Sequence, residues 1–232
     1  MTTHARPRQP RAPLGTPRLL APRGVYAPQY DTDLLLRALH EERVDAWTDV
    51  LDLGTGTGAL AVAAARLGAR VTAVDRSWRA VWTARLNARL NRAPVTVRHG
   101  DLASAFPPAS FDLILSNPPY VPSPSAALPS RGPARAWDGG LDGRSVVDGV
   151  CDAAPRALRP GGTLLMVHSQ LCDADASLMR LAGHGMSAAV IDKAHVPFGP
   201  VTLARRSWLC AQGRLDDAAT HEELVVIRAA LL

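Results

Sequence analysis

The sequence has few of the residues that build disulfide frameworks, metal sites or membrane spans. Its 232 residues hold three cysteines (Cys151, Cys172 and Cys210), none of them in a Cys-x-x-Cys pair, and seven histidines without the spacing of metal ligands. This excludes a disulfide scaffold and predicts a protein without structural metal. No apolar run approaches the roughly 20 residues that span a bilayer, so we expect no membrane partner.

Lysine is almost absent as well, so arginine carries the positive charge. Lys193 is the only lysine, yet the formal net charge is +5, and five arginines fall within residues 1–23. That proline-rich segment lacks the apolar stretch of a secretory signal, so we predict a flexible basic tail and a cytoplasmic protein. Residues 24–232 are enough for one α/β domain and too few for two comfortable ones.

The apolar residues after the tail alternate between the spacing of strands and the spacing of helices. This alternation predicts a mostly parallel sheet covered by helices on both faces, with ligands bound beyond the carboxyl ends of the strands. Strands are expected at residues 49–54, 71–75, 95–101, 111–116, 163–169 and 223–229. Helices are expected at residues 31–44, 59–68, 77–91, 145–158, 173–181 and 203–212, the first of them capped by Asp31 or Thr32.

A glycine-rich loop follows the first expected strand. The stretch LDLGTGTGAL places Gly54, Gly56 and Gly58 between that strand and a helix, where missing β-carbons let the backbone approach a ligand closely. Gly54, Gly56 and Ala59 also satisfy the G-x-G-x-x-G/A fingerprint of dinucleotide-binding folds. The loop alone therefore leaves two kinds of ligand open.

Three aspartates narrow the choice of ligand. Asp75, at the end of the second strand, could bind an adenosine ribose in either case. Asp52 precedes the loop, where a carboxylate can meet a ligand's positive charge or organise the loop but would repel a pyrophosphate. Asp101, in HGDL, could accept a hydrogen bond from an adenine amino group. These positions indicate an adenosine with a cationic, amino-acid-like extension.

The stretch FDLILSNPPY runs an apolar strand into a stiff polar loop. Proline fixes its own φ and favours extended geometry in the residue before it, so Asn117 and Pro118 form a nearly pre-set pair of acceptors. The side-chain oxygen of Asn117 and the carbonyl of Pro118 could both accept from one visiting NH2 group, with the flat face of Tyr120 beside it. We predict a site for an NH2 substrate.

These motifs, in this order, resemble the class I S-adenosylmethionine-dependent methyltransferases. The segments GVYAPQYDTDLL, SNPPYVP and AWDGGLDGRSVVD resemble the HemK-type protein glutamine methyltransferases, in their short eukaryotic and archaeal-like branch. The resemblance implies a Rossmann-like, doubly wound α/β sheet of seven mostly parallel strands whose last strand is antiparallel. It also implies catalytic residues at Asn117, Pro118 and Tyr120. The residues implied to bind S-adenosylmethionine are Thr32, Asp52, Gly54, Gly56, Gly58, Asp75, Asp101, Leu102 and Asn117.

The expected activity is methyl transfer to an NH2 nitrogen, foremost the glutamine of a release factor's Gly-Gly-Gln loop. An exocyclic amine of a nucleic-acid base fits the same acceptor pair, and the basic charge agrees with such a partner. A small-molecule amine is a further alternative, and a cofactor-binding scaffold without catalysis is the non-enzymatic one. The resemblance also implies a small zinc-binding activator subunit as a partner.

Overall fold

The structure is a computed structural model that describes residues 17–102 and 106–232. In these ranges seven strands form one sheet in the order β3-β2-β1-β4-β5-β7-β6. Neighbouring strands are parallel except that β7 runs antiparallel to both β5 and β6, which confirms the predicted fold class. The strands are β1 (Asp49–Leu53), β2 (Arg70–Asp75), β3 (Val95–His99), β4 (Phe111–Ser116), β5 (Leu158–Ser169), β6 (Met186–Pro197) and β7 (His221–Leu231).

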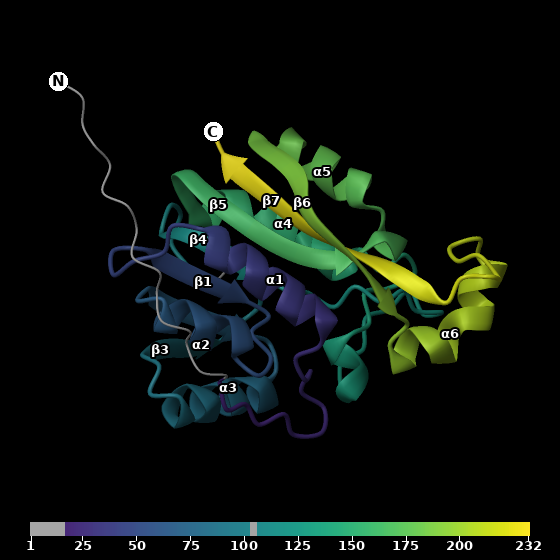
Figure 1. Cartoon of the computed structure of the whole chain (residues 1–232), viewed down its shortest axis with the longest axis horizontal. Helices are drawn as coiled ribbons and strands as arrows, with labels where there is room; N and C mark the ends of the chain where they lie inside the picture. Colours follow the sequence, from purple (N-terminus) through teal and green to yellow (C-terminus); the bar gives the residue numbers. More distant parts are fainter. Residues whose placement is uncertain (1–16, 103–105) are drawn as a thin grey trace.

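Helices cover both faces of the sheet, and Figure 1 shows α1 in front of it and α4 behind. Helices α1 to α3 belong to one face, α4 and α5 to the other, and α6 lies beside the ends of β6 and β7. The helices are α1 (Tyr30–Glu41), α2 (Ala59–Arg66), α3 (Trp78–Leu90), α4 (Ser145–Ala157), α5 (Ala174–Gly183) and α6 (Pro200–Ala211), with short 3-10 turns η2 (Pro133–Ala136) and η3 (Gln170–Cys172).

The core consists of two apolar layers, one on each face. Successive residues of a strand point to opposite faces, and so Val50 packs with residues of α1 to α3 whereas Leu51 packs with residues of α4 and α5. Both side chains are fully buried. The continuous apolar runs of the sequence are therefore strands that are covered on both sides.

The sequence patterns miss one strand, β6. Along most of its length β6 alternates between exposed and half-buried residues, and it lies at the edge of the sheet beside β7. A strand with one solvent-facing side carries no continuous apolar run, which was the signal used to find the other strands. The remaining strands and helices agree with the predictions to within a few residues, apart from β5, which starts at Leu158.

The predicted cap of α1 is wrong. The residue before the helix is Gln29, whose side chain makes no capping hydrogen bond. Asp31 and Thr32 lie inside the first turn and are buried, with exposed fractions of 2% and 3%. Their side chains are engaged at the site described below, and Asp31 accepts from the amide of its neighbour Thr32 inside the first turn instead of capping the helix from the residue before it.

Part of the predicted tail lies along α3. The Asn91 carboxamide accepts from the Arg18 N–H at 2.9 Å and donates to the Arg18 carbonyl at 2.7 Å. Asn87 does the same with Leu20, at 2.8 Å for both bonds. Each carboxamide thus satisfies the backbone of one residue in the extended segment. Residues 1–16, on which most of the tail prediction rests, lie outside the described residues.

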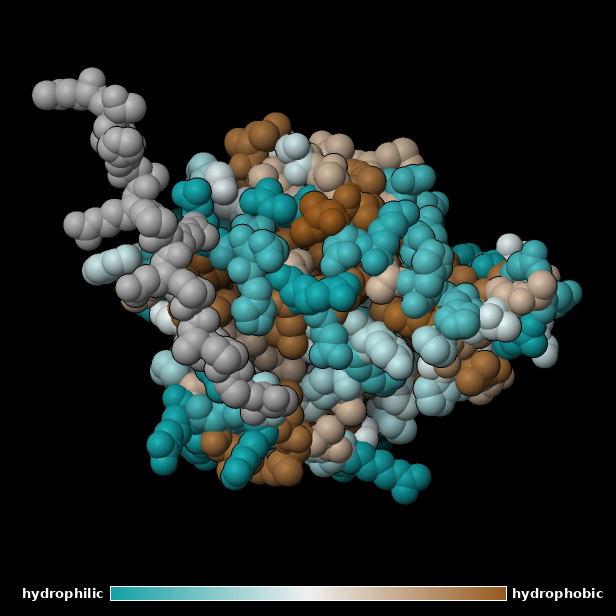
Figure 2. All heavy atoms as spheres, in the orientation of Figure 1, coloured by the Kyte–Doolittle hydropathy of each residue, from teal (hydrophilic) through white to brown (hydrophobic). Residues whose placement is uncertain are grey.

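The surface is mainly hydrophilic on the face that carries α1. Figure 2 shows hydrophilic side chains over most of this face, interrupted by separate hydrophobic patches. Within the described ranges, no helix combines the length and the apolarity that crossing a membrane requires.

Candidate active site

The ends of three parallel strands bring the predicted site residues together. Leu53 lies beside Val74 of β2 and Ser116 of β4 in the sheet register. The Ser116 hydroxyl also donates to the Leu53 carbonyl at 3.0 Å, which fixes the end of β4 against β1. The glycine loop, Asp75 and Asn117 therefore leave the sheet at the same edge, as expected for a ligand site of a doubly wound fold.

The glycine loop turns tightly from β1 into α2. The amides of Gly54 and Thr55 both donate to the Val74 carbonyl at 3.0 Å. Gly54 and Gly56 have φ angles of +73° and +55°, a left-handed conformation that glycine adopts without strain. The bare glycines thus leave the backbone accessible at the edge of the sheet, beside Thr55 and Thr57, which also line the cavity described below.

Gly58 has a different place from the other two glycines. A β-carbon on Gly58 would lie 3.1 Å from the Ala84 β-carbon on α3, so its bare backbone allows α2 to pack closely against α3. It is not among the residues that line the cavity described below. The predicted contact of Gly58 with a cofactor is therefore indirect in this geometry.

Asp75 holds the glycine loop and the start of α3 together. Its carboxylate accepts from the Gly56 amide at 3.0 Å and from the Ser77 amide at 2.8 Å. Burial raises the pKa of Asp75, and these two backbone hydrogen bonds oppose the rise. Both contacts leave lone pairs on the carboxylate for a ligand hydroxyl.

Asp52 is buried beneath the loop. One of its oxygens accepts from the Thr55 hydroxyl at 2.6 Å and from the Ala61 amide at 3.1 Å. The other oxygen has no hydrogen-bond partner among the described residues. Burial raises the pKa of Asp52 to about 7. Of the two roles predicted for Asp52, organising the loop is thus visible in its contacts.

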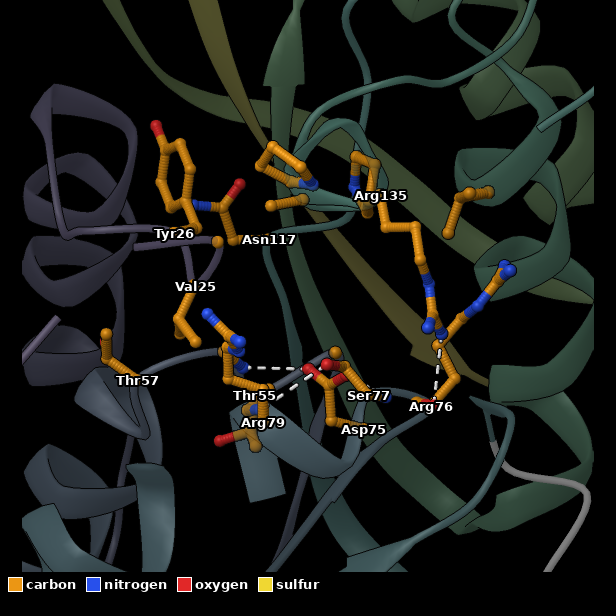
Figure 3. A pocket seen from close by; sticks show the side chains of 18 of the residues that line it. Val25, Tyr26, Thr55, Thr57, Asp75, Arg76, Ser77, Arg79, Asn117 and Arg135 are labelled. Atoms are coloured by element: carbon orange, nitrogen blue, oxygen red, sulfur yellow. Dashed lines mark hydrogen bonds between the residues drawn. The ribbon is translucent and has the colours of Figure 1, made fainter. Parts of the chain in front are cut away.

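A large cavity of about 520 Å³ opens at this edge of the sheet. Figure 3 shows Tyr26 and Asn117 on one side of it, Asp75 and Ser77 on another, and Arg135 across from them. Asp52 and Gly58 do not reach its wall. The predicted cofactor residues that line it are Thr32, Gly54, Gly56, Asp75, Asp101, Leu102 and Asn117.

A second, small cavity of about 30 Å³ lies next to the large one. The two cavities share Tyr26, Asn117, Pro119 and Ala136 as lining residues. The small cavity also contains the remaining predicted catalytic residues, Pro118 and Tyr120. A group bound in the small cavity would therefore lie beside a group bound in the large one.

Hydrogen bonds tie the wall of the small cavity to α1. The Tyr26 and Tyr120 hydroxyls donate to the same Asp31 oxygen, at 2.7 and 3.0 Å. The Asn117 side-chain NH2 donates to the Thr32 hydroxyl at 3.4 Å. Burial and the nearby Asp31 charge raise the pKa of both tyrosines, so both hydroxyls stay protonated at neutral pH.

The segment between β4 and α4 closes over both cavities. Leu128, Gly132 and Arg135 line the large cavity, and Trp137 lines the small one. The Val121 amide donates to the Trp137 carbonyl at 2.8 Å, which holds the segment against the start of the acceptor loop. A long connection in this position can cover a bound substrate.

Sequence reasoning missed Tyr26 and Asp31 as site residues. Tyr26 lies in the N-terminal segment, whereas Tyr120 lies after β4, 89 positions from Asp31. Asp31 precedes an apolar periodic stretch, a position that predicts a helix cap. A polar residue on the otherwise buried face of the α1 pattern, next to Leu34 and Leu35, is the one local signal for its role.

The comparisons with known proteins agree with this geometry. A family model described as the methyltransferase small domain matches residues 18–127. A protein of Methanocaldococcus jannaschii, provisionally named protein N5-glutamine methyltransferase, is 33% identical over 175 residues, which cover 75% of this chain and 87% of that protein. The chain belongs to the HemK-type glutamine methyltransferases. It is an S-adenosylmethionine-dependent N-methyltransferase by family.

Two bacterial relatives of this chain are longer than it is. The release factor glutamine methyltransferase of Bordetella pertussis is 40% identical over 170 residues, which cover 68% of this chain and 62% of that protein. The release factor glutamine methyltransferase of Mycolicibacterium smegmatis is 35% identical over 158 residues, which cover 65% and 56%. The chain thus spans little more than half the length of these bacterial relatives.

Solved structures share the fold of this HemK-type chain. The E. cuniculi Mtq2-Trm112 complex, described as responsible for methylation of the translation termination factor eRF1, has a TM-score of 0.63 at 23% identity and covers 90% of this chain and 99% of that one. The T. thermophilus 16S rRNA N2 G1207 methyltransferase, in complex with AdoMet and guanosine, has a TM-score of 0.61 at 24% identity and covers 89% and 44%. At these identities the likeness establishes the fold.

Proposed function

We propose that the chain transfers a methyl group from S-adenosylmethionine to the side-chain amide of a glutamine in a translation release factor. The observation that carries the proposal is the small cavity at Asn117 and Tyr120, which adjoins the large cavity through shared lining residues. A methyl donor in the large cavity and an NH2 group in the small one would meet at Asn117. Positioning of this kind can supply a large part of a barrier reduction.

The residues of the large cavity fit S-adenosylmethionine. A volume of about 520 Å³ is in the usual range of small-molecule sites. Asp75 and Asp101 supply acceptors for ribose hydroxyls and an adenine amino group, and the bare loop at Gly54 and Gly56 permits close approach. The buried Asp52, whose second oxygen is unpartnered among the described residues, lies beneath the loop, where a cationic ligand would favour its ionised form.

The remaining predicted cofactor residues complete the proposed site. We assign Thr32 to the methionine end, Leu102 to the adenine side and Gly58 to the packing that sets the loop. When bound, S-adenosylmethionine supplies a methyl group whose bond to sulfur breaks as the acceptor nitrogen bonds the carbon, leaving S-adenosylhomocysteine and a proton that passes to water.

The acceptor nitrogen needs activation because an amide is a poor nucleophile. The Asn117 side-chain oxygen and the Pro118 carbonyl accept hydrogen bonds from its two N–H groups. These bonds draw the nitrogen toward a pyramidal, more nucleophilic state and stabilise the charge that develops. The ring of Tyr120 confines the amide from the side. A strong base is unnecessary, since the proton leaves after the new bond has formed.

The size of the small cavity favours an amide over a nucleobase. A volume of about 30 Å³ holds roughly two water molecules, because about 10–15 Å³ of such space holds one. A glutamine carboxamide adds only a carbon, an oxygen and a nitrogen, whereas a flipped purine is several times larger. Most of a flipped base would therefore lie outside the small cavity.

The names of the relatives support a release factor as the protein substrate, and such a substrate places the reaction in the cytoplasm. The activator subunit that the family resemblance implies is part of the same proposal. We expect purified chain alone to be slow with a release factor, and co-purified chain and activator to be faster.

Labelling of a cell extract tests the proposal against its alternatives. Purified chain and methyl-labelled S-adenosylmethionine are added to an extract from cells that lack the enzyme, and the product is digested with protease or nuclease. Label released by protease alone supports a protein amide. Label released by nuclease alone shows a nucleic-acid substrate, and label in neither polymer shows a small-molecule amine.

A further inference from the structure

We propose that Asp31 is a positioning residue that orients Tyr26, Tyr120 and Asn117 in the acceptor site, an inference that rests on the function proposed above. One of its oxygens holds two tyrosines, and the other holds Thr32, which in turn sets the direction of the Asn117 carboxamide. Asp31 itself comes from α1 and would act through these neighbours.

The two tyrosines are walls of the small cavity that Asp31 holds in place. Tyr26 belongs to the segment before α1, and Tyr120 to the loop after β4. Their hydroxyls converge on Asp31 Oδ2 at 2.7 and 3.0 Å, and Asp31 is 2% exposed. Hydrogen bonds to an ionised acceptor are among the stronger ones in proteins. The carboxylate thus joins segments that are distant in sequence.

The orientation of Asn117 follows from the chemistry of its neighbours. The Thr32 hydroxyl lies 3.2 Å from Asp31 Oδ1 and 3.4 Å from Asn117 Nδ2. A carboxylate only accepts hydrogen bonds, so the single hydroxyl proton points at Asp31 and a lone pair faces Asn117. The Asn117 group beside Thr32 must then be the NH2. Its carbonyl oxygen is left to accept from a substrate.

The hydrogen bonds that run from Asp31 through Thr32 to Asn117, called the relay below, explain why a charged side chain is buried at the start of α1. The Thr32 amide also donates to Asp31 Oδ1, at 2.6 Å, so both oxygens are saturated by neutral donors. Removing a carboxylate from water costs free energy unless such donors replace the solvent. Without Asp31, the Thr32 hydroxyl could donate to Asn117 instead, and a flipped carboxamide would present NH2 to an NH2 substrate.

The first test replaces Asp31 by asparagine, with Asp33→Asn as a matched control. Asp33 lies on the same helix, is exposed and carries the same charge. In Asp31→Asn an NH2 group replaces one acceptor, so a donor faces a donor at Thr32 or at the tyrosines. We expect kcat to fall about 100-fold, in line with removal of a preorganised polar group, while the Kd for S-adenosylmethionine stays within about threefold. Asp33→Asn should match the unchanged chain.

The second test separates the relay from general damage to the fold. Thr32→Val keeps the shape but removes the hydroxyl and should lower kcat as far as Asp31→Asn does. Thr32→Ser restores a hydroxyl and should recover most of kcat. Because the residues act as a unit, the double variant Asp31→Asn/Thr32→Val should be no slower than either single variant.

Specific results would overturn the relay. These are an unchanged kcat in Asp31→Asn, no recovery in Thr32→Ser, or losses that multiply in the double variant. Failure of the release-factor proposal is seen separately, as inactivity of the unchanged chain toward release factor, and the variants are then assayed with whichever acceptor the extract labelling identifies.

A stability measurement tests the Asp31–Tyr120 contact without any methyl acceptor, and so applies even if the chain is inactive toward release factor. Asp31→Asn, Tyr120→Phe and the double variant are compared by thermal unfolding. If Asp31 holds Tyr120, the double variant loses clearly less Tm than the sum of the two single losses. Additive losses would contradict the proposed contact, whatever the substrate.

Discussion

Replacing Asn117 by alanine should abolish most methyl transfer while leaving cofactor binding nearly intact. The residue follows Ser116, which is fully buried and anchored to β1, so the change removes the carboxamide without moving the strand end. A lost hydrogen-bond partner of the reacting group costs about 2.7–4 kcal/mol of transition-state stabilisation, or roughly 100- to 1,000-fold in kcat. We expect a loss in this range.

The effect on the cofactor should be much smaller. Asn117 also lines the large cavity, but its side-chain hydrogen bond goes to Thr32. We therefore expect the Kd for S-adenosylmethionine to change by less than about threefold, which corresponds to under about 0.7 kcal/mol. Asn91→Ala is a matched control, because it removes the same carboxamide just after α3, outside the lining of both cavities.

The assay measures initial rates of labelled methyl transfer over a range of acceptor concentrations, with cofactor Kd from calorimetry. A kcat that falls as the Kd rises in proportion would show that Asn117 acts through the cofactor. A kcat within threefold of the unchanged chain would refute the acceptor role of the loop altogether.

Asp75→Ala should raise the Kd for S-adenosylmethionine at least about tenfold, since the hydrogen bonds to the Gly56 and Ser77 amides and the proposed ribose contact are lost; a lower kcat at saturating cofactor with an unchanged Kd would contradict this. Gly58→Val should lower the free energy of unfolding by about 2–5 kcal/mol, because of its φ of +82° and the contact with Ala84, whereas Gly183→Ala, with open space, should be close to neutral in the same urea titration. Burial lowers the pKa of His168 to about 4, so the unfolded state binds more protons between pH 6.5 and 4, and stability falls as pH falls. His168→Gln should remove about 2 kcal/mol of the stability change between pH 7 and 5; an unaltered pH dependence would show that another group is responsible.

Much of the fold could be predicted because its signals are local. The apolar runs of β1 and β4 reflect burial on both faces, and glycines mark where the first strand turns into α2. β6 escaped the same reasoning because its residues alternate at the sheet edge. Its place is determined by pairing with β7, and no short stretch of sequence encodes that pairing.

The site residues also divide into those with a local sequence signal and those grouped only by the fold. The glycine loop and Asn117 to Tyr120 each occupy a short stretch and could be assigned from residue chemistry alone. The grouping of Tyr26, Asp31 and Tyr120 joins segments 89 positions apart, and only the packing of α1 against the sheet creates it. The interpretation of Asp31 as a cap failed because a tertiary contact outweighed a local preference.

The most direct test of the account is to locate the methyl group on a defined substrate. Release factor from cells that lack the modification is incubated with the purified chain, with and without its co-purified activator, and S-adenosylmethionine, and its peptides are sequenced by mass spectrometry. The account predicts one methyl group on the side-chain nitrogen of the Gly-Gly-Gln glutamine, and none when Asn117→Ala replaces the unchanged chain. An unmodified glutamine, under conditions in which the same preparation methylates a nucleic acid or a small amine, would contradict it.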